Sequence, residues 1–238
     1  MNQLAKRLAH PLKVEYSTLV ETISAVEQGY IVQTKNTNTH KNHSYFAKSI
    51  LMTCPIPQSL SILHTSHYVI TAQDRILLEK VKYTRCIGIL ALLSDPSILP
   101  DGYLSQPVPG VISWIGDNKQ KGICESPSLT LHLDSEWSNT HYDKNDAMIW
   151  ELILPYLTKL FGNSIDPNLT HQIKRWRFAQ AYDLIEAPYL DIGKSYPLVI
   201  CGDAFSSINT EKRSKVENAA LSGMAAADYL LDIRGRLC

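Results

Sequence analysis

Residues 196–231 read "YPLVICGDAFSSINTEKRSKVENAALSGMAAADYLL", and this stretch decides the expected fold class. An apolar run typical of a buried strand ends at Gly202 and Asp203, a polar loop follows, and the chain then enters a helix made mostly of small residues. In open α/β sheets, ligands bind outside the carboxyl ends of the strands. An acid there can accept hydrogen bonds from the hydroxyl groups of a ligand, such as those of a ribose or ribityl chain. The stretch therefore predicts part of an α/β sheet with a candidate binding site at its edge.

The start of the last helix carries the S-x-x-E pattern of a capping box, from Ser214 to Glu217. This pattern predicts Ser214 as the N-cap, with Val216 and Glu217 in the first turn. The free N–H groups and the positive dipole end of such a terminus favour a carbonyl, a phosphate or a developing anion. A capped, Ala-rich helix packed on a sheet also occurs without a ligand, and Asp is an ordinary turn residue. The residues alone leave both interpretations open.

Upstream, the pattern predicts a short helix that ends before Pro11, followed by two or three antiparallel strands with a turn at Gly29. The apolar run "SILMTCP", residues 49–55, is typical of a buried strand at the centre of a sheet. A helix with Pro57 near its first position follows.

The middle of the chain is rich in strands, with two helices. We expect a helix over residues 70–83, strands over 84–94, 110–118 and 128–134, and a loop marked by four prolines between the first two of these strands. A helix over residues 144–162 should be kinked or interrupted at Pro155. This order predicts an α+β domain of the substrate-binding type between about residues 65 and 195.

The composition excludes several classes of partner. Basic and acidic residues balance at 23 each, so the net charge provides no reason to expect binding to nucleic acid or to a membrane. Five widely spaced cysteines without a C-x-x-C pair argue against a disulfide framework and favour a reducing, cytoplasmic location. We expect neither a signal peptide nor a membrane span, because no long apolar run occurs. We expect no metal site, because the two His-x-x-His pairs lack matched further ligands.

The string "GDAF…KVENAALSGMAAADYLL" resembles the C-terminal flavin-binding signature of the FAD-dependent amine oxidase superfamily. The runs "SLTLHLDSEWSNTHYD" and "HQIKRWRFAQAY" are similar to its renalase-like NAD(P)/FAD-dependent branch, as is the opening "MNQLAKRLAHPLKVEYSTLVETI". The resemblance covers most of the chain. It implies an α/β plus α+β fold, in which an incomplete FAD-binding Rossmann-like domain (residues 1–64 and 196–238) carries an inserted antiparallel-sheet substrate domain (residues 65–195).

The resemblance also implies site residues for FAD. Gly202 and Asp203 map to the position beside the pyrophosphate and ribityl chain, Trp176 resembles a residue at the flavin side of the substrate cavity, and Val20 resembles the position whose backbone meets adenine. The first turn of the last helix would offer backbone N–H groups to the pyrimidine edge of the flavin. The residues that map to this turn are Val216, Glu217, Asn218 and Ala219.

The chain departs from the family pattern in two places. Asn218 stands where family members usually carry Gly, and the sequence contains no G-x-G-x-x-G turn to hold the pyrophosphate. Without the strands of that first unit, residues 49–55 and 196–203 would lose neighbours and expose apolar edges. We therefore expect a truncated gene product, a half completed by a second chain that supplies the dinucleotide-binding segment, or a remnant that no longer oxidises a substrate.

Two functions follow as hypotheses. In the first, the chain is an FAD-dependent oxidoreductase in which a hydride passes from an amine or a reduced nicotinamide-type small molecule to flavin N5, and then to O2. In the second, it is a non-catalytic remnant or an interaction subunit that binds a partner chain through an exposed sheet edge. The absence of a catalytic triad does not separate them, because a flavin carries the redox chemistry itself.

Overall fold

The computed structural model describes residues 2–95, 99–162, 165–166, 168–206 and 213–234. The chain forms two compact units. Unit 1 is built from the chain up to Val81 and again from Asp183 onward, and unit 2 is the segment between them. The boundaries expected from the sequence were residues 64 and 195. The segments 65–81 and 183–195 therefore lie in unit 1.

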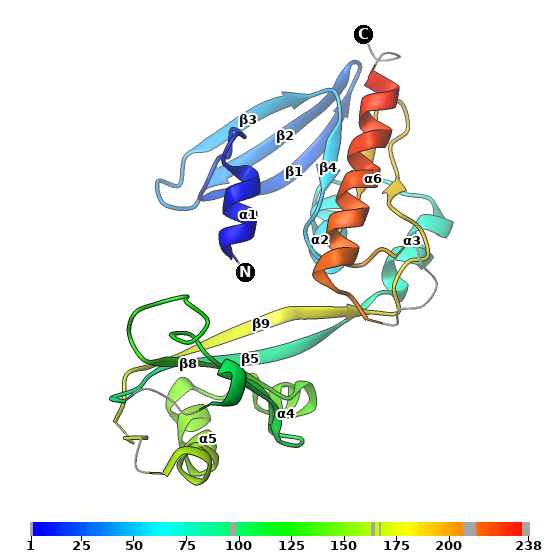
Figure 1. The fold of residues 1–238 in the computed structure, drawn as a ribbon. Coiled ribbons are helices and arrows are strands. Elements are labelled where there is room, and N and C mark those ends of the chain that lie inside the picture. The colour runs from blue at the N-terminus through cyan, green and yellow to red at the C-terminus, as the bar shows by residue number, and fades with distance from the viewer. Residues whose placement is uncertain (1, 96–98, 163–164, 167, 207–212, 235–238) are drawn as a thin grey trace. The chain divides into compact units, whose positions relative to one another are not determined.

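One sheet of unit 1 is antiparallel and follows the chain, in the order β1–β2–β3 (Figure 1). The predicted turn at Gly29 is confirmed: this residue has a φ of 149°, and a Cβ added to it would overlap the carbonyl oxygen of Ala47. Only glycine fits such a close approach of two strands. The strands of this sheet are β1 (Thr18–Val26), β2 (Gly29–Asn36) and β3 (Asn42–Ala47).

The other sheet of unit 1 has the order β10–β11–β4, with β11 antiparallel to β10 and parallel to β4. The prediction of a buried strand before Gly202 is confirmed, since all three residues of β11 are fully buried. The prediction of a central strand at residues 49–55 is wrong. Among the described strands, β4 pairs with β11 alone and lies at an edge, so its Leu51 is 38% exposed. The strands are β4 (Ile50–Met52), β10 (Leu190–Asp191) and β11 (Leu198–Ile200).

The helices of unit 1 lie near the positions that the sequence patterns predict, but the helix expected over residues 70–83 ends at Lys80, and Tyr83 lies in a strand. Pro57 lies in the first turn of α2, where a missing N–H costs nothing, and the Thr71 hydroxyl caps α3 by accepting from the Asp74 N–H. Helix α6 packs its buried Ala226 against Val199 and Cys201. No helix in the described part of the chain is both long and apolar enough to cross a membrane. The helices are α1 (Asn2–Ala9), α2 (Ile56–Thr65), α3 (Ala72–Lys80) and α6 (Val216–Arg234).

Unit 2 is a five-stranded antiparallel sheet in the order β6–β7–β8–β5–β9, with α4 and α5 on one side of it (Figure 1). The strands predicted over residues 84–94, 110–118 and 128–134 are confirmed. A short 3-10 turn, Pro100–Gly102, precedes β6. The elements are β5 (Lys82–Leu92), β6 (Tyr103–Val108), β7 (Ile112–Asp117), β8 (Ser128–Leu133), α4 (Ser135–His141), α5 (Asp146–Phe161) and β9 (His171–Tyr182).

The two faces of this sheet differ because side chains alternate along each strand. Ile87 and Ile89 of β5 and Leu131 of β8 are fully buried in a core that includes Ile149 and Ile153 of α5. The residues between them point to the opposite side, which we call the open face. Its members on β5, β8 and β9 are Gly88, Leu90, Leu92, Ser128, Thr130, His132, Gln172, Lys174 and Trp176.

Two proline-based expectations need correction. Pro107 lies inside β6 and not in a loop. Strand β6 tolerates it because β6 is an edge strand whose pairing with β7 shifts register between Ser105 and Val108, so the missing N–H breaks no continuous row of hydrogen bonds. At Pro155 the sequence predicted a kink or an interruption, and the interruption does not occur. Helix α5 runs continuously from Asp146 to Phe161 through this exposed proline.

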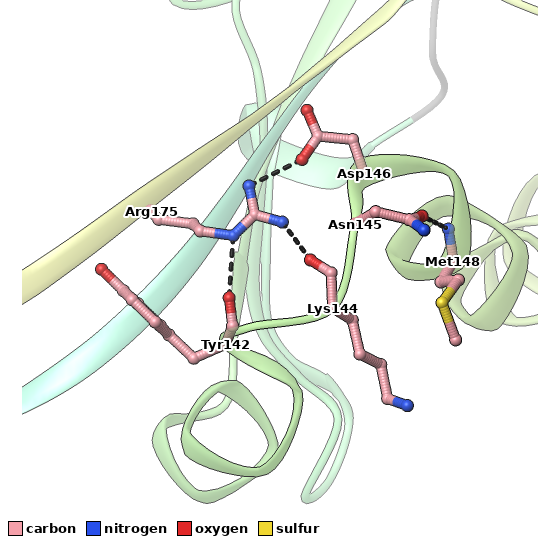
Figure 2. A network of polar contacts seen from close by, with 6 residues as sticks. All are labelled: Tyr142, Lys144, Asn145, Asp146, Met148 and Arg175. Carbon is pink, nitrogen blue, oxygen red and sulfur yellow. Dashed lines mark hydrogen bonds and ion pairs between the residues drawn. The ribbon is translucent and has the colours of Figure 1, made fainter.

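The connection between α4 and α5 is held by Arg175 of β9, which was not singled out from the sequence (Figure 2). Its Nε donates to the carbonyl oxygen of Tyr142 at 2.9 Å, and Nη2 donates to that of Lys144 at 2.5 Å. Its Nη1 contacts the Asp146 carboxylate at 2.6 Å. Asn145, which precedes Asp146, is the N-cap of α5, since its side chain accepts from the Met148 N–H. Arg175 therefore fastens both helices to the sheet.

Candidate functional site

The turn after β11 adopts a backbone that suits glycine. Gly202 has a φ of 132°, a region that other residues rarely adopt. Its N–H donates to Ser222 Oγ at 2.9 Å, and its carbonyl accepts from the Phe205 N–H at 3.2 Å. Asp203 follows, partly buried, at the carboxyl end of the strand. Asp203 thus directly follows the strand, and the Gly202 N–H is already used within the protein.

Ser222 ties this turn to the middle of α6. The residue is 3% exposed, and besides accepting from Gly202 its hydroxyl donates to the Pro188 carbonyl oxygen at 2.6 Å. It lies beside Cys201, whose pKa is raised by burial and lowered to a smaller extent by a hydrogen bond with Ser222. The sequence showed Ser222 only as one of several small residues, so its role as the link between strand end and helix was missed.

The first turn of α6 lies next to the same loop. Helix α6 begins at Val216, one residue later than a Ser214 cap implies, and the side chain of Asn218 accepts from the Lys215 N–H at 2.9 Å. Asn218 therefore fills the reciprocal role that the capping-box pattern assigned to Glu217. The Nδ2 of Asn218 also donates to Ser206 Oγ at 3.4 Å. The Asn218 side chain is thus held back against the loop.

These contacts link two segments, the turn with its following loop and helix α6, which carry six of the eight residues that the sequence singled out. The N–H of Ala219 already donates to the Lys215 carbonyl oxygen at 3.3 Å. The three N–H groups before it in this turn have no carbonyl four residues earlier within the helix, and such groups are the usual donors to a ligand at a helix start. Val216 is 61% exposed at the start of that turn. The six residues, from the turn and the helix start, are Gly202, Asp203, Val216, Glu217, Asn218 and Ala219.

The seventh residue, Val20, lies on β1 in the other sheet of unit 1. It is partly buried and comes directly before a break in the β1–β2 register, between Val20 and Thr22. Such an irregularity leaves backbone groups outside the regular ladder. This position is compatible with a backbone contact to a ligand.

The eighth residue, Trp176, lies in unit 2 on the open face, and its side chain is 45% exposed. Its ring meets that of His132 edge-on at 5.4 Å between centroids, and His132 meets Trp114 at 5.1 Å. Burial, followed by the charge of Lys121, lowers the pKa of His132. Trp114 and His132 were visible as alternate positions of predicted strands, but their convergence depends on the strand order, which the sequence did not predict.

Thiol and metal chemistry receive no support from the described geometry. Within the described ranges, no three His, Cys, Asp or Glu side chains gather in a way that could hold a metal ion. Cys54, Cys86, Cys124 and Cys201 are free thiols. Burial raises the pKa of Cys86 to about 11, so this thiol stays protonated at neutral pH.

The fold can be compared with solved structures. Wild-type putrescine oxidase bound to putrescine matches with a TM-score of 0.69 over 97% of this chain, at 16% sequence identity. The A394C mutant from a structure-based redesign of cofactor binding in putrescine oxidase matches with a TM-score of 0.65 over 98% of this chain, at 14% identity. The fold is similar to part of putrescine oxidase.

This similarity is one of fold, since the sequences differ at most positions. The chain spans about half of those structures, covering 53% of each. The sequence matches no protein-family model and no curated protein. The mixed α/β architecture with antiparallel sheets is therefore one that an oxidase of this kind also uses.

Proposed function

We propose that this chain is part of an FAD-dependent oxidoreductase of the amine oxidase superfamily, with a renalase-like relationship to its NAD(P)/FAD-dependent members. One observation supports this most strongly. The turn at Gly202 and Asp203 is bonded to the middle of α6 through Ser222, and the loop after it is bonded to the first turn of α6 through Ser206, within a fold similar to half of an oxidase. A carboxylate at a strand end and a helix N-terminus are the groups that would meet the hydroxyls and carbonyls of a flavin nucleotide.

Each residue has a distinct role in this proposal. Asp203 accepts hydrogen bonds from the ribityl hydroxyls, and the N–H groups of Val216, Glu217 and Asn218 donate to the carbonyl groups of the flavin ring. The backbone at Val20 meets the adenine. When bound, the flavin supplies the redox chemistry, taking a hydride from the substrate and passing electrons to O2. Unit 1 then corresponds to the remainder of a Rossmann-like FAD-binding domain.

Unit 2 is the substrate domain in this proposal, inserted into the chain of unit 1. Trp176 on its open face contributes to the wall of the substrate cavity. The substrate is a small molecule, for which the resemblance offers an amine or a reduced nicotinamide-type compound. The putrescine oxidase structure, which holds putrescine, is an example of the first class.

A second candidate, an interaction subunit completed by another chain, is favoured by the edge of the β10–β11–β4 sheet. Leu51 on β4 is 38% exposed although it pairs with a fully buried strand. Helix α6 exposes Val216, Met224 and Leu231, which recur at helical spacing. An exposed strand edge is a site where another chain can add a strand, and exposed apolar side chains on a helix can contact such a chain. A second chain carrying the dinucleotide-binding segment would fit there.

A titration of the protein with FAD, in which binding is monitored by the quenching of flavin fluorescence, tests the role of Asp203. We expect Asp203→Asn to weaken FAD binding about 10- to 100-fold, because hydrogen bonds to a charged group contribute about 1.5–3 kcal/mol. Asp228→Asn, an exposed acid in the middle of α6, is the matched control and should leave the affinity unchanged. Equal affinity of the Asp203 variant and the wild type would contradict the assignment.

A further inference from the structure

The open face of unit 2 carries an aromatic cluster, and one of its rings requires a glycine beneath it. A Cβ added to Gly116 would overlap the ring of Trp114, which therefore lies across this glycine. At Gly88 an added Cβ would lie 3.9 Å from Cη2 of Trp176. The two indole rings lie over bare backbone, with His132 between them in edge and tilted contacts. The result is an aromatic surface on the sheet, not a buried core.

A cavity adjoins this surface along the strands. Gly88 is opposite His132 on β8, and two residues further along β5 Leu90 is opposite Thr130. The cavity has a volume of about 280 Å³, and its lining includes Leu90, Leu92, Asn118, Ser128 and Gln172. Leu90 and Leu92 are 39% and 48% exposed. Apolar walls with a few amide and hydroxyl groups are typical of pockets for small molecules.

The charged groups around the aromatic cluster are basic. The Lys121 ammonium lies 4.3 Å from the ring centroid of Trp114, and Lys174 is opposite Gly88 on the neighbouring strand. The nearby carboxylate of Asp117 is 1% exposed and accepts from the backbone and side-chain N–H groups of Gln120, so it is turned away into its own loop. An ammonium ligand would meet two lysines here, whereas an anion would be attracted.

We propose that the open face binds a planar aromatic anion, a flat ring system that carries a carboxylate or a phosphate. The ring packs against the exposed indole of Trp176, and the anionic group lies toward Lys121 and Lys174. This inference rests on the proposed function in one respect, since it names this ligand as the substrate of unit 2. It distinguishes the chain from an oxidase whose ligand is a dication such as putrescine.

Three naphthalene probes of matched shape test the proposal by equilibrium dialysis with the full chain and no flavin. The probes are 2-naphthoate, 2-naphthalenemethanol and 2-naphthylmethylammonium. We expect naphthoate to bind about fivefold or more tightly than the neutral alcohol, from the attraction of two exposed lysines, and the ammonium to bind most weakly. Equal or tighter binding of the ammonium would overturn the proposal.

Variants locate the binding on the open face. Lys121→Gln and Lys174→Gln should each reduce the preference for naphthoate over the alcohol, while Lys119→Gln, an exposed neighbour in the same turn, should preserve it. Trp176→Leu should weaken all three probes together. If that variant does not fold, as judged by near-UV circular dichroism, the lysine variants carry the test. An unchanged preference for naphthoate over the alcohol in both Lys121→Gln and Lys174→Gln would also overturn the proposal.

The outcome is separable from that of the proposed function. A chain that binds naphthoate but takes up no FAD keeps this inference and contradicts the flavin proposal. If the chain binds FAD but prefers the ammonium probe, the flavin proposal is supported and this inference is contradicted.

Discussion

At the scale of single residues, Gly116 determines whether Trp114 can lie on the sheet. A methyl group at this position would overlap the indole ring, which must then leave its place beside His132. We expect Gly116→Ala to lower the free energy of unfolding by about 1–3 kcal/mol, the usual cost of overpacking. Urea denaturation followed by tryptophan fluorescence measures this.

Gly223 is the matched control because it lies inside α6 with no atom within 4 Å of an added Cβ. Gly223→Ala should raise the free energy of unfolding by about 0.5–1 kcal/mol, since alanine loses less backbone entropy in a helix. A Gly116→Ala variant that is as stable as Gly223→Ala would show that Trp114 does not lie across the glycine.

His132 predicts a dependence of stability on pH. Burial and the charge of Lys121 lower its pKa in the folded state below the ordinary value of about 6.5. The folded state thus disfavours the protonated imidazole. The neutral His132 therefore contributes its full stability to the folded state above pH 6.5, and this stability is lost as the pH falls through 6.5 toward the folded pKa. Relative to His132→Gln, the wild type should therefore lose stability between pH 7.5 and pH 5 in urea unfolding. Parallel pH profiles for the two proteins would contradict the burial of a neutral His132.

The sequence could predict site residues whose chemistry is local. Asp203 directly follows the apolar run that predicts its strand, and the start of α6 directly follows the polar residues that predict a helix start. Trp114 and His132 could not be paired with Trp176 in this way. Their contact depends on β5 lying between β8 and β9, and strand order is set by packing over the whole sheet.

At the scale of elements, Arg175 holds the connection between α4 and α5 (Figure 2). We expect Arg175→Ala to lower the free energy of unfolding by about 1–3 kcal/mol, because two backbone carbonyl groups lose their donors. The ion pair itself contributes little, since the Asp146 side chain is 59% exposed. Chemical denaturation measures the change.

Two variants separate these contributions. Asp146→Asn should cost less than about 1 kcal/mol and respond to salt, whereas the loss from Arg175→Ala should be nearly independent of salt. Arg177→Ala, an exposed neighbour on β9, should change the stability by less than about 0.5 kcal/mol. A larger loss from Asp146→Asn than from Arg175→Ala would assign the stabilisation to the ion pair instead.

Pro155 weakens α5 without adding a buried contact. The ring lacks the N–H that would donate to the Glu151 carbonyl group, and the residue is exposed. We expect Pro155→Ala to raise the free energy of unfolding by about 1–2 kcal/mol, together with an increase in helical circular dichroism. Lys159→Ala in the last turn is the control and should change little. A fall in stability on replacing Pro155 would mean that its ring contributes to packing.

Elements with strong periodicity were predictable, and those that depend on context were not. The alternation in β7 and β8 and the apolar run of β11 led directly to strands. Helix α4 was missed, although Asp134 caps it by accepting from the N–H groups of Glu136 and Trp137. Seven residues are too short for a helical period to emerge. Strand β6 was missed because Pro107 reads as a loop until the edge position is known.

At the scale of the whole molecule, the two units divide the candidate chemistry between them. Unit 1 holds the turn at Gly202 with the start of α6, and unit 2 holds the aromatic surface on its open face. The boundaries expected from the sequence were residues 64 and 195. The limits at Val81 and Asp183 reflect the long β5 and β9 strands, which pair with one another from their first and last residues. Such long-range pairing has no local signature in the sequence.

The central claim is that this chain carries part of a flavin-binding site. The most direct measurement is the visible absorbance spectrum of the purified chain after addition of FAD and removal of free flavin by gel filtration. It is recorded alone and with a second polypeptide that carries the dinucleotide-binding segment. We predict flavin bands that elute with the protein in at least one of these samples and are lost with Asp203→Asn. No protein-bound flavin in either sample would contradict the claim.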